Sequence, residues 1–202
     1  MKLGRSFEIT FAHAESLILA AAHATATGHC LNRFITIIFK HPDERIRTQE
    51  ALQKFIKLAS DWLRYNDAPV AYIWVIENPV GVDEHVHILI HVPHNMAARL
   101  SRLTRTWIRR TGAEVCKGVA RSEPIVSFDG LMGLLRYLLK GCSPEAAAMF
   151  RIRQKPQGWV TGKRCGMSQS LGATARARDN GVVAPHERPC STKSSDGSGR
   201  NT

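Results

Sequence analysis

The sequence predicts a single α+β domain in which a βαββαβα series of elements builds an antiparallel sheet. Runs rich in β-branched and aromatic residues alternate with stretches whose apolar residues recur at helical spacing. The turn signal Asn78-Pro79-Val80-Gly81 separates two of the strand-like runs and predicts a hairpin. A length of 202 residues with 44% hydrophobic content accommodates one domain with a substantial core, and no fused helicase.

The first half of the series is a strand, a helix and the hairpin. Residues 33–40 are β-branched and aromatic and predict the first strand. Apolar residues at helical spacing predict a helix over residues 42–65. Residues 70–77 predict the second strand, and the third begins at His85 after the turn signal. Pairing of these two strands would bring Glu77 beside the third strand.

The second half supplies a helix, a weaker strand and another helix. A helix is expected over residues 94–110, an extended region over 114–128 and a short helix over 129–141. Asp129 is the candidate N-cap of the last helix, and Gly141 stands just past its end. This order of elements is that of ferredoxin-like or RRM-like α+β domains.

Two segments flank this domain, which is expected to span residues 31–168 with a basic extension at its C-terminal end. Residues 1–30 predict an N-terminal extension with helical character. Residues 169–202 are dominated by Gly, Ser, Arg and Asn, with almost no apolar periodicity, and predict a disordered tail.

The strand that begins at His85 has the most informative pattern. Its residues alternate, so that His85, His87, Leu89 and His91 share one face and the intervening apolar residues share the other. Two imidazoles two residues apart point the same way and, with Glu77 from the paired strand, would form a His-His-Glu metal site. His91 lies about 13 Å beyond His87 along a strand and is expected outside that site, as a surface or DNA-contact residue. A lone strand histidine is more often a satisfied polar residue, so a second motif has to decide.

That second motif is Tyr137 and Lys140, one turn apart in the helix predicted over residues 129–141. At 100° per residue the leucines of this helix gather on one face, and these two residues fall on the other. A tyrosine used for packing would belong among the leucines. Tyr137 sits beside Lys140 instead, which favours a role other than packing, and the alternative is an exposed tyrosine beside an ordinary surface lysine.

A formal net charge of +11 favours a polyanionic partner. The helix predicted over residues 94–110 has no acidic residue and has arginines away from its apolar stripe, namely Arg99, Arg102, Arg105 and Arg109. Such a row could bind phosphates, or be only a solvated face. Further along, Trp159, Lys163 and Arg164 combine an aromatic ring with cations, which suits single-stranded DNA. A buried tryptophan in a closing turn is equally consistent.

Together, the His-x-His strand at residues 85–87, the preceding Glu77 and the Tyr-x-x-Lys helix at 137–140 resemble the HUH endonuclease superfamily. The closest likeness is to its single-tyrosine initiators (Rep proteins) of rolling-circle replication in plasmids and phages or other small DNA viruses. The resemblance covers roughly residues 32–141.

The resemblance implies a site-specific endonuclease and strand transferase that nicks single-stranded DNA at a replication origin. A divalent metal, Mg²⁺ or Mn²⁺, would be held by Glu77, His85 and His87 and would polarise the scissile phosphate. Tyr137 would attack it, leaving a 3′-hydroxyl and a covalent 5′-phosphotyrosine. Lys140 would help the phenol lose its proton, or help place metal and phosphate. The implied partners are single-stranded DNA or an origin hairpin, and a host helicase.

Other interpretations stay open. An RRM-like domain could bind RNA or single-stranded DNA without cutting it, although it would place aromatics on the sheet face where this sequence has histidines. A transposase or relaxase would keep the same chemistry, but relaxases usually have a third strand histidine and an N-terminal tyrosine, whereas Tyr137 follows the histidines. A HIT-type nucleotide hydrolase would need a histidine at position 89, where Leu89 stands.

The sequence gives a cytoplasmic expectation. The five cysteines include no CxxC pair, which favours reduced thiols. The apolar stretch at residues 17–22 is short and follows Glu8 and Glu15, unlike a signal peptide. No segment is long enough to cross a membrane, so no membrane partner is expected.

Overall fold

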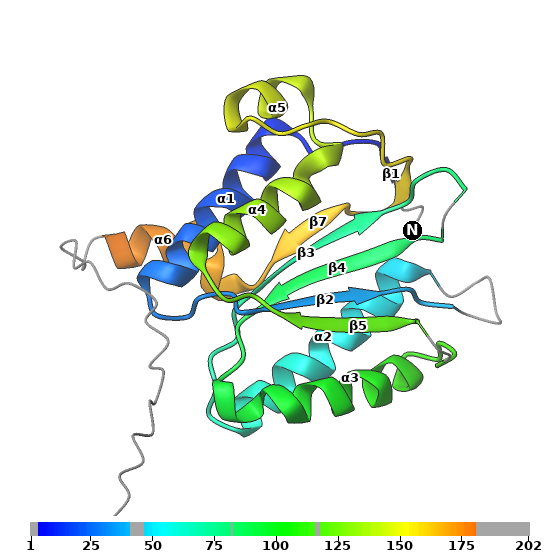
Figure 1. The fold of residues 1–202 in the computed structure, drawn as a ribbon, viewed down its shortest axis with the longest axis vertical. Helices are drawn as coiled ribbons and strands as arrows, with labels where there is room; N and C mark the ends of the chain where they lie inside the picture. The colour runs from blue at the N-terminus through cyan, green and yellow to red at the C-terminus, as the bar shows by residue number, and fades with distance from the viewer. Residues whose placement is uncertain (1–3, 41–46, 82, 116–117, 181–202) are drawn as a thin grey trace, which may run out of the picture.

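The computed structural model describes residues 4–40, 47–81, 83–115 and 118–180. Its centre is a five-stranded antiparallel sheet of order β5-β2-β4-β3-β7 (Figure 1). The strands are β2 (Arg33–Ile37), β3 (Tyr72–Glu77), β4 (His85–Ile90), β5 (Ala120–Pro124) and β7 (Cys165–Met167). A short ribbon pairs β1 (Arg5–Ser6) with β6 (Val160–Thr161). The α+β class is confirmed, and the order of β5, β2, β4 and β3 is compatible with the ferredoxin-like arrangement.

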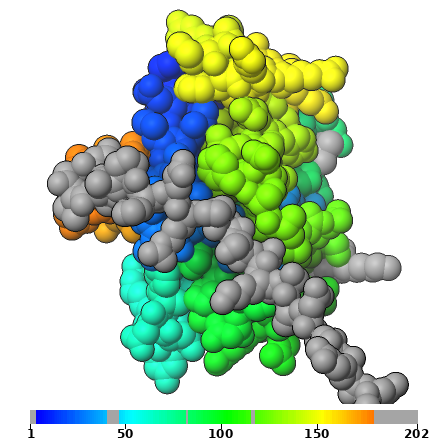
Figure 2. Space-filling view, turned by 60° about the vertical axis from the view of Figure 1, so that its left-hand side comes forward, coloured from blue at the N-terminus to red at the C-terminus, as the bar shows by residue number. Residues whose placement is uncertain are grey.

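Helices cover both faces of the sheet (Figure 1). On one face lie α2 (Thr48–Tyr65) and α3 (Ala97–Arg110), the latter preceded by the 3-10 turn η1 (His94–Met96). On the other face lie α1 (Phe11–Ala26) and α4 (Phe128–Leu138). After α4 come η2 (Leu139–Gly141), α5 (Pro144–Phe150), η3 (Gln169–Leu171) and α6 (Ala173–Asn180). Figure 2 shows α5 and the segment after it above α1 and α4.

Strand alternation divides the apolar residues between two cores. Even-numbered residues of β3 and β4, such as Trp74 and Ile88, pack against α2 and α3. Odd-numbered residues, such as Val75 and Leu89, pack against α1 and α4. At the end of the sheet where β3 stops and β4 begins, the α1/α4 side carries polar residues instead. This end is where a site can form without breaking either core.

The sequence predicts helical character before residue 31 and disorder after residue 168, and the structure has helices on both flanks. Residues 11–26 form α1, an apolar helix whose Ala20, Ala21 and Ala24 are fully buried, so it belongs to the core. The predicted disorder from residue 169 is wrong for residues 169–180, which form η3 and α6. Arg176 secures this end by donating to the carbonyl of Leu171 at 2.7 Å and to Ser16 Oγ at 3.2 Å. The rest of the predicted tail, residues 181–202, lies outside the described residues.

None of the helices within the described ranges has the length and apolar character needed to span a membrane.

Gly158 sets how the chain after α5 passes the end of β3. Its φ is +62°, and a Cβ added there would overlap the carbonyl oxygen of Asn78. Asn78 in turn donates through its amide N to Gln157 O at 3.0 Å and through Nδ2 to Trp159 O at 2.8 Å. The two chain segments therefore touch backbone to backbone at a glycine.

We expect Gly158→Ala to lower the free energy of unfolding by roughly 2–4 kcal/mol, because the overlapping atom belongs to the backbone and cannot rotate away. Urea denaturation measures this. The matched control is Gly133→Ala in α4, where an added Cβ meets nothing within 4 Å and helix propensity should add up to about 1 kcal/mol. Equal stabilities of the two variants would contradict the close approach at Gly158.

Candidate active site

Strands β3 and β4 and the end of α4 bring both sequence motifs to one cavity of about 300 Å³. Its lining consists of Glu77, Pro79, His85, His87, Tyr137, Lys140, Lys155 and Gln157. Five of these eight are the residues that the two motifs single out. The motifs come from opposite halves of the chain, so their meeting is a property of the fold.

The β3–β4 hairpin places the acidic and imidazole side chains together. Its antiparallel register pairs Glu77 with His85, as the turn signal predicts, and His87 follows two residues along on the same face. The His85 and His87 rings stack with centroids 6.0 Å apart and an interplanar angle of 12°. His87 Nε2 lies 3.4 Å from Glu77 Oε2. This cluster is the polar end of the sheet.

The neighbouring strand β2 orients His87. Thr36 is its partner in the β2–β4 register, and Thr36 Oγ1 lies 3.0 Å from His87 Nδ1. Phe34 stacks on the same imidazole, with ring centroids 5.5 Å apart. Because Thr36 contacts Nδ1, the other ring nitrogen, Nε2, faces Glu77. A hydrogen bond to one ring nitrogen commonly fixes the orientation of a histidine that binds metal through the other. Phe34 and Thr36 belong to the Phe-x-Thr strand at residues 34–36, which resembles an early strand of the HUH endonucleases, but no contact with His87 was predicted for either residue.

Helix α4 presents the tyrosine because of how its ends are formed. The helix begins at Phe128 with Ser127 as N-cap, which accepts from Gly130 N at 3.0 Å, so the predicted cap Asp129 lies inside the first turn. Leu131 and Leu135 are fully buried against the sheet, which leaves the opposite side of the helix outward. Tyr137 is on that side, and its side chain is 55% exposed.

Lys140 joins the two motifs. The helix tightens into η2 after Leu138, and this turn brings Lys140 inward, where only 8% of it is exposed. Its Nζ donates to Glu77 Oε2 at 2.8 Å and lies 3.6 Å from the centroid of the Tyr137 ring. One ammonium thus contacts both the carboxylate of the hairpin and the phenol of the helix.

The charge states in the cavity suit ligation of a cation. Burial raises the pKa of Glu77, but hydrogen bonds from His87 and Lys140 outweigh burial and hold that pKa below its ordinary value. Burial and the neighbouring His87 lower the pKa of His85, which keeps its imidazole neutral at neutral pH. An ionised carboxylate and a neutral imidazole are the forms that bind metals.

One atom of the cluster is unsatisfied: Glu77 Oε1 is buried and has no hydrogen-bond partner among the described residues. A buried carboxylate oxygen without a donor is unfavourable, and a cation would satisfy it. Carboxylate plus imidazole is a donor set that Mg²⁺, Mn²⁺ and Zn²⁺ all accept. Across the described ranges, no three His, Cys, Asp or Glu side chains already stand at metal-site spacing. Glu77, His85 and His87 thus line one cavity without standing at the spacing of bound ligands.

The predicted DNA contacts on α3 are not brought to this cavity. All four arginines are exposed, but α3 packs on the opposite face of the sheet from α4. They are Arg99, Arg102, Arg105 and Arg109.

The three residues of the second predicted DNA surface, Trp159, Lys163 and Arg164, differ in their exposure. Trp159 is 41% exposed, with the Arg5 guanidinium 4.2 Å from its ring centroid, and Lys163 is exposed. Arg164 is buried, and its Nη2 donates to the carbonyls of Ser6 at 2.9 Å and Gly158 at 2.6 Å. The expectation of a DNA contact is therefore corrected for Arg164, because its guanidinium already holds the C-terminal extension to the N-terminal strand.

His91 stays apart from the cavity, as its distance along the strand predicts. Its Nδ1 lies 2.9 Å from the carbonyl oxygen of Cys30, and its ring meets that of His29 edge-on at 5.7 Å. It is held by these structural contacts.

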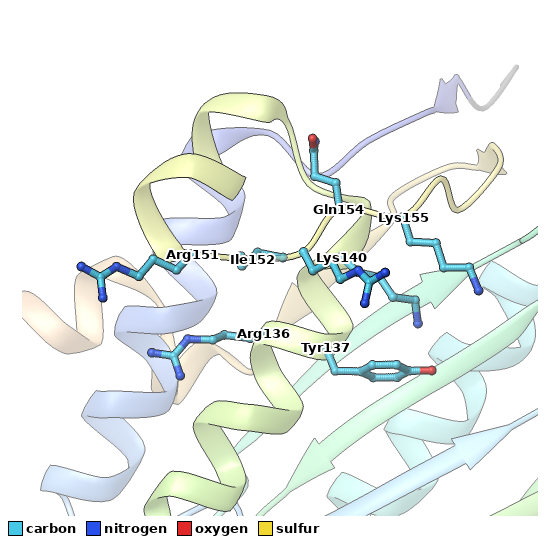
Figure 3. Close-up of a pocket in the computed structure, with 8 residues that line it drawn as sticks. Arg136, Tyr137, Lys140, Arg151, Ile152, Gln154 and Lys155 are labelled. Atoms are coloured by element: carbon cyan, nitrogen blue, oxygen red, sulfur yellow. The ribbon is translucent and has the colours of Figure 1, made fainter.

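A larger cavity of about 620 Å³ adjoins the first and includes cations that the site prediction left out (Figure 3). These are Arg136, Arg151, Arg153 and Lys155. The signal for Arg151, Arg153 and Lys155 in the sequence was the alternation of cations over residues 151–155. Neither a known family model, nor a curated protein, nor a solved structure significantly matches the chain. The side chains of the two cavities and their geometry are therefore what indicates a function.

We expect Lys140→Met to lower the free energy of unfolding by roughly 3 kcal/mol, because it leaves the Glu77 carboxylate buried without its cation. Urea denaturation measures the loss. The double variant Glu77→Gln/Lys140→Met should regain much of it, since neither charge remains. The exposed hydroxyl removed by Tyr137→Phe should have little effect. Losses that simply add in the double variant would show that the two residues are not coupled.

Proposed function

We propose that the protein is a metal-dependent tyrosine endonuclease. It would nick single-stranded DNA at a replication origin through a covalent 5′-phosphotyrosine and so initiate rolling-circle replication. The observation that carries this proposal is the shared cavity: an exposed tyrosine opens onto the same space as a carboxylate and two imidazoles. The resemblance of these residues to the HUH endonuclease motifs supplies the reaction class and the role in replication.

The chemistry balances without an external energy source. The Tyr137 phenol loses its proton and its oxygen attacks the scissile phosphorus, forming the tyrosine–phosphate bond. The bond from phosphorus to O3′ breaks, and O3′ takes up a proton. One phosphate ester replaces another, so the strand can later be rejoined by the reverse reaction. Exposure of Tyr137 lets a phosphate approach its hydroxyl, and the ammonium of Lys140 lies against the face of its ring.

Glu77, His85 and His87 are the residues that would hold a divalent metal, and the unpartnered Glu77 Oε1 fits that role. When bound, such an ion supplies positive charge to the phosphate oxygens as the attack proceeds. The donor set does not discriminate among divalent metals, and the resemblance favours Mg²⁺ or Mn²⁺. Thr36 would keep His87 turned with Nε2 toward the ion.

The non-catalytic binding module is less well supported. An RRM-like domain binds single strands on an exposed sheet face with aromatic side chains. Here α1 and α4 cover that face, and α2 and α3 cover the other (Figure 1). A transposase or relaxase would use the same side chains, and the order of histidines before tyrosine favours the initiator.

A nicking assay tests the proposal. Pooled single-stranded oligonucleotides from the protein's own replicon are incubated with protein and Mn²⁺ or EDTA and resolved on denaturing gels. We expect a Mn²⁺-dependent protein–DNA adduct that falls at least about 1,000-fold in Tyr137→Phe and in His87→Ala. The matched control is Tyr65→Phe, which removes a hydroxyl from a tyrosine that is 86% exposed on α2. Binding without an adduct, unaffected by EDTA, would exclude the nuclease.

Metal binding has an independent readout in thermal unfolding. At Mn²⁺ about ten times its dissociation constant, linkage adds roughly 1.4 kcal/mol and should raise Tm by about 3–6 °C. This rise should disappear in His87→Ala. It should persist in His91→Ala, which removes an imidazole from the same strand face outside the cavity. An undiminished rise in His87→Ala would place the metal elsewhere.

A further inference from the structure

The larger cavity beside the active site, which we call the basic cleft, has a composition suited to a polyanion. Its lining is Arg136, Tyr137, Lys140, Arg151, Ile152, Arg153, Gln154 and Lys155. Five of these eight residues are cations and none is an acid. Tyr137, Lys140 and Lys155 also line the active-site cavity, so the two spaces share a wall.

On one side of the basic cleft, every second residue of the segment 151–155 is anchored to the rest of the protein. Ile152 is buried, and its amide N donates to Ala147 O at 2.9 Å. Gln154 Nε2 donates to the carbonyl of Cys142 at 2.7 Å. The residues between and beyond these anchors are exposed cations: Arg151, Arg153 and Lys155. Lys155 is itself fixed through its amide N, which donates to Lys140 O at 2.8 Å. The cations therefore stand on a backbone that is already ordered.

Arg151 occupies an unusual backbone position. It ends α5 in the left-handed conformation, with φ 53° and ψ 48°, where glycine is the usual residue. A residue with a Cβ costs about 1 kcal/mol there relative to glycine. The Arg151 side chain lines the cleft together with that of Arg136. Figure 3 shows both side chains extending to the same side, away from the Tyr137 hydroxyl.

Resting on the proposed nuclease function, we propose that the basic cleft holds the single-stranded DNA segment 3′ of the attacked phosphate. In an in-line displacement the leaving O3′ lies on the far side of phosphorus from the attacking Tyr137 oxygen, so the 5′ segment leads away from the tyrosine. The 3′ segment is the one that becomes joined to Tyr137. It remains on the tyrosine side, where the cleft opens. Its phosphates then meet arginine forks that bind phosphate oxygens in pairs.

The first test measures binding of fluorescein-labelled oligo(dT) ten nucleotides long by anisotropy. Arg151→Gly should weaken binding about five- to tenfold and reduce the salt slope of log K by about 0.7, the value for one lost phosphate contact on a single strand. Glycine relieves the left-handed backbone, so the loss cannot come from misfolding. The matched control is Lys54→Gln, which removes an exposed charge from α2 on the other face of the sheet. Binding by Arg151→Gly equal to wild type overturns the proposal.

The second test addresses strand polarity. Unlabelled oligo(dT) of the same length, with a phosphate at either its 5′ or its 3′ end, competes for the protein in Mn²⁺. The 5′-phosphate mimics the scissile phosphate with its 3′ segment in the cleft. That competitor should bind at least about fivefold tighter than the 3′-phosphate, which has the same charge. The preference should vanish in His87→Ala. A preference for the 3′-phosphate, or none in the wild type, overturns the assigned polarity.

The two proposals fail in different ways. If the wild type forms the DNA adduct while Arg151→Gly binds the probes normally, the basic cleft is not the strand site and the nuclease stands. If no adduct forms while the probes behave as expected, the cleft binds 5′-phosphorylated strands and the nuclease proposal alone fails.

Discussion

The ion pair between Lys140 and Glu77 is the contact on which the site depends. It joins the end of the tyrosine helix to the end of β3, and both side chains are buried. Buried ion pairs of this kind are weak devices for stability, because desolvation offsets most of the attraction and apolar residues of similar volume do as well. The pair is better explained by its role in positioning Tyr137. The ammonium that contacts Glu77 also lies on the Tyr137 ring, so the pair sets the distance between the phenol and the hairpin.

The location of the site follows from the way the sheet is covered. Helices seal both faces, so a polar group can avoid the cores only where the strands end. Val75 and Leu89 meet α1 and α4 on the same face that carries Glu77, His85 and His87 nearer the hairpin. Helix α4 ends at this place, which brings its last turn over the polar residues. Glu77 Oε1 is buried at this place and has no hydrogen-bond partner among the described residues.

Local periodicity was enough to predict the hairpin and the leucine face of α4, because both depend only on spacing within one element. The contact of Lys140 with Glu77 depends on a 3-10 turn that redirects one side chain, which helical geometry does not foresee. Arg164 was misassigned because a buried arginine that donates to carbonyls and a surface arginine on DNA have the same local sequence. Residues 169–180 were misjudged since a polar helix can be secured by a few contacts, here those of Arg176. The arginines of α3 were correctly expected to be exposed, but amphipathicity does not say which face of the sheet a helix covers.

The wall shared by the two cavities gives the proposed reaction its direction. On one side Tyr137 faces an ionised carboxylate and imidazoles, a place for a metal ion and one phosphate. On the other side it lines the basic cleft, whose charged side chains are all cations, a place for a chain of phosphates. A strand held in the basic cleft would deliver its first phosphate at the tyrosine and remain bound there after the bond to O3′ breaks. Under the proposed function, the freed 3′-hydroxyl would lie outside the basic cleft and could leave to prime synthesis while the covalent end stayed with the protein.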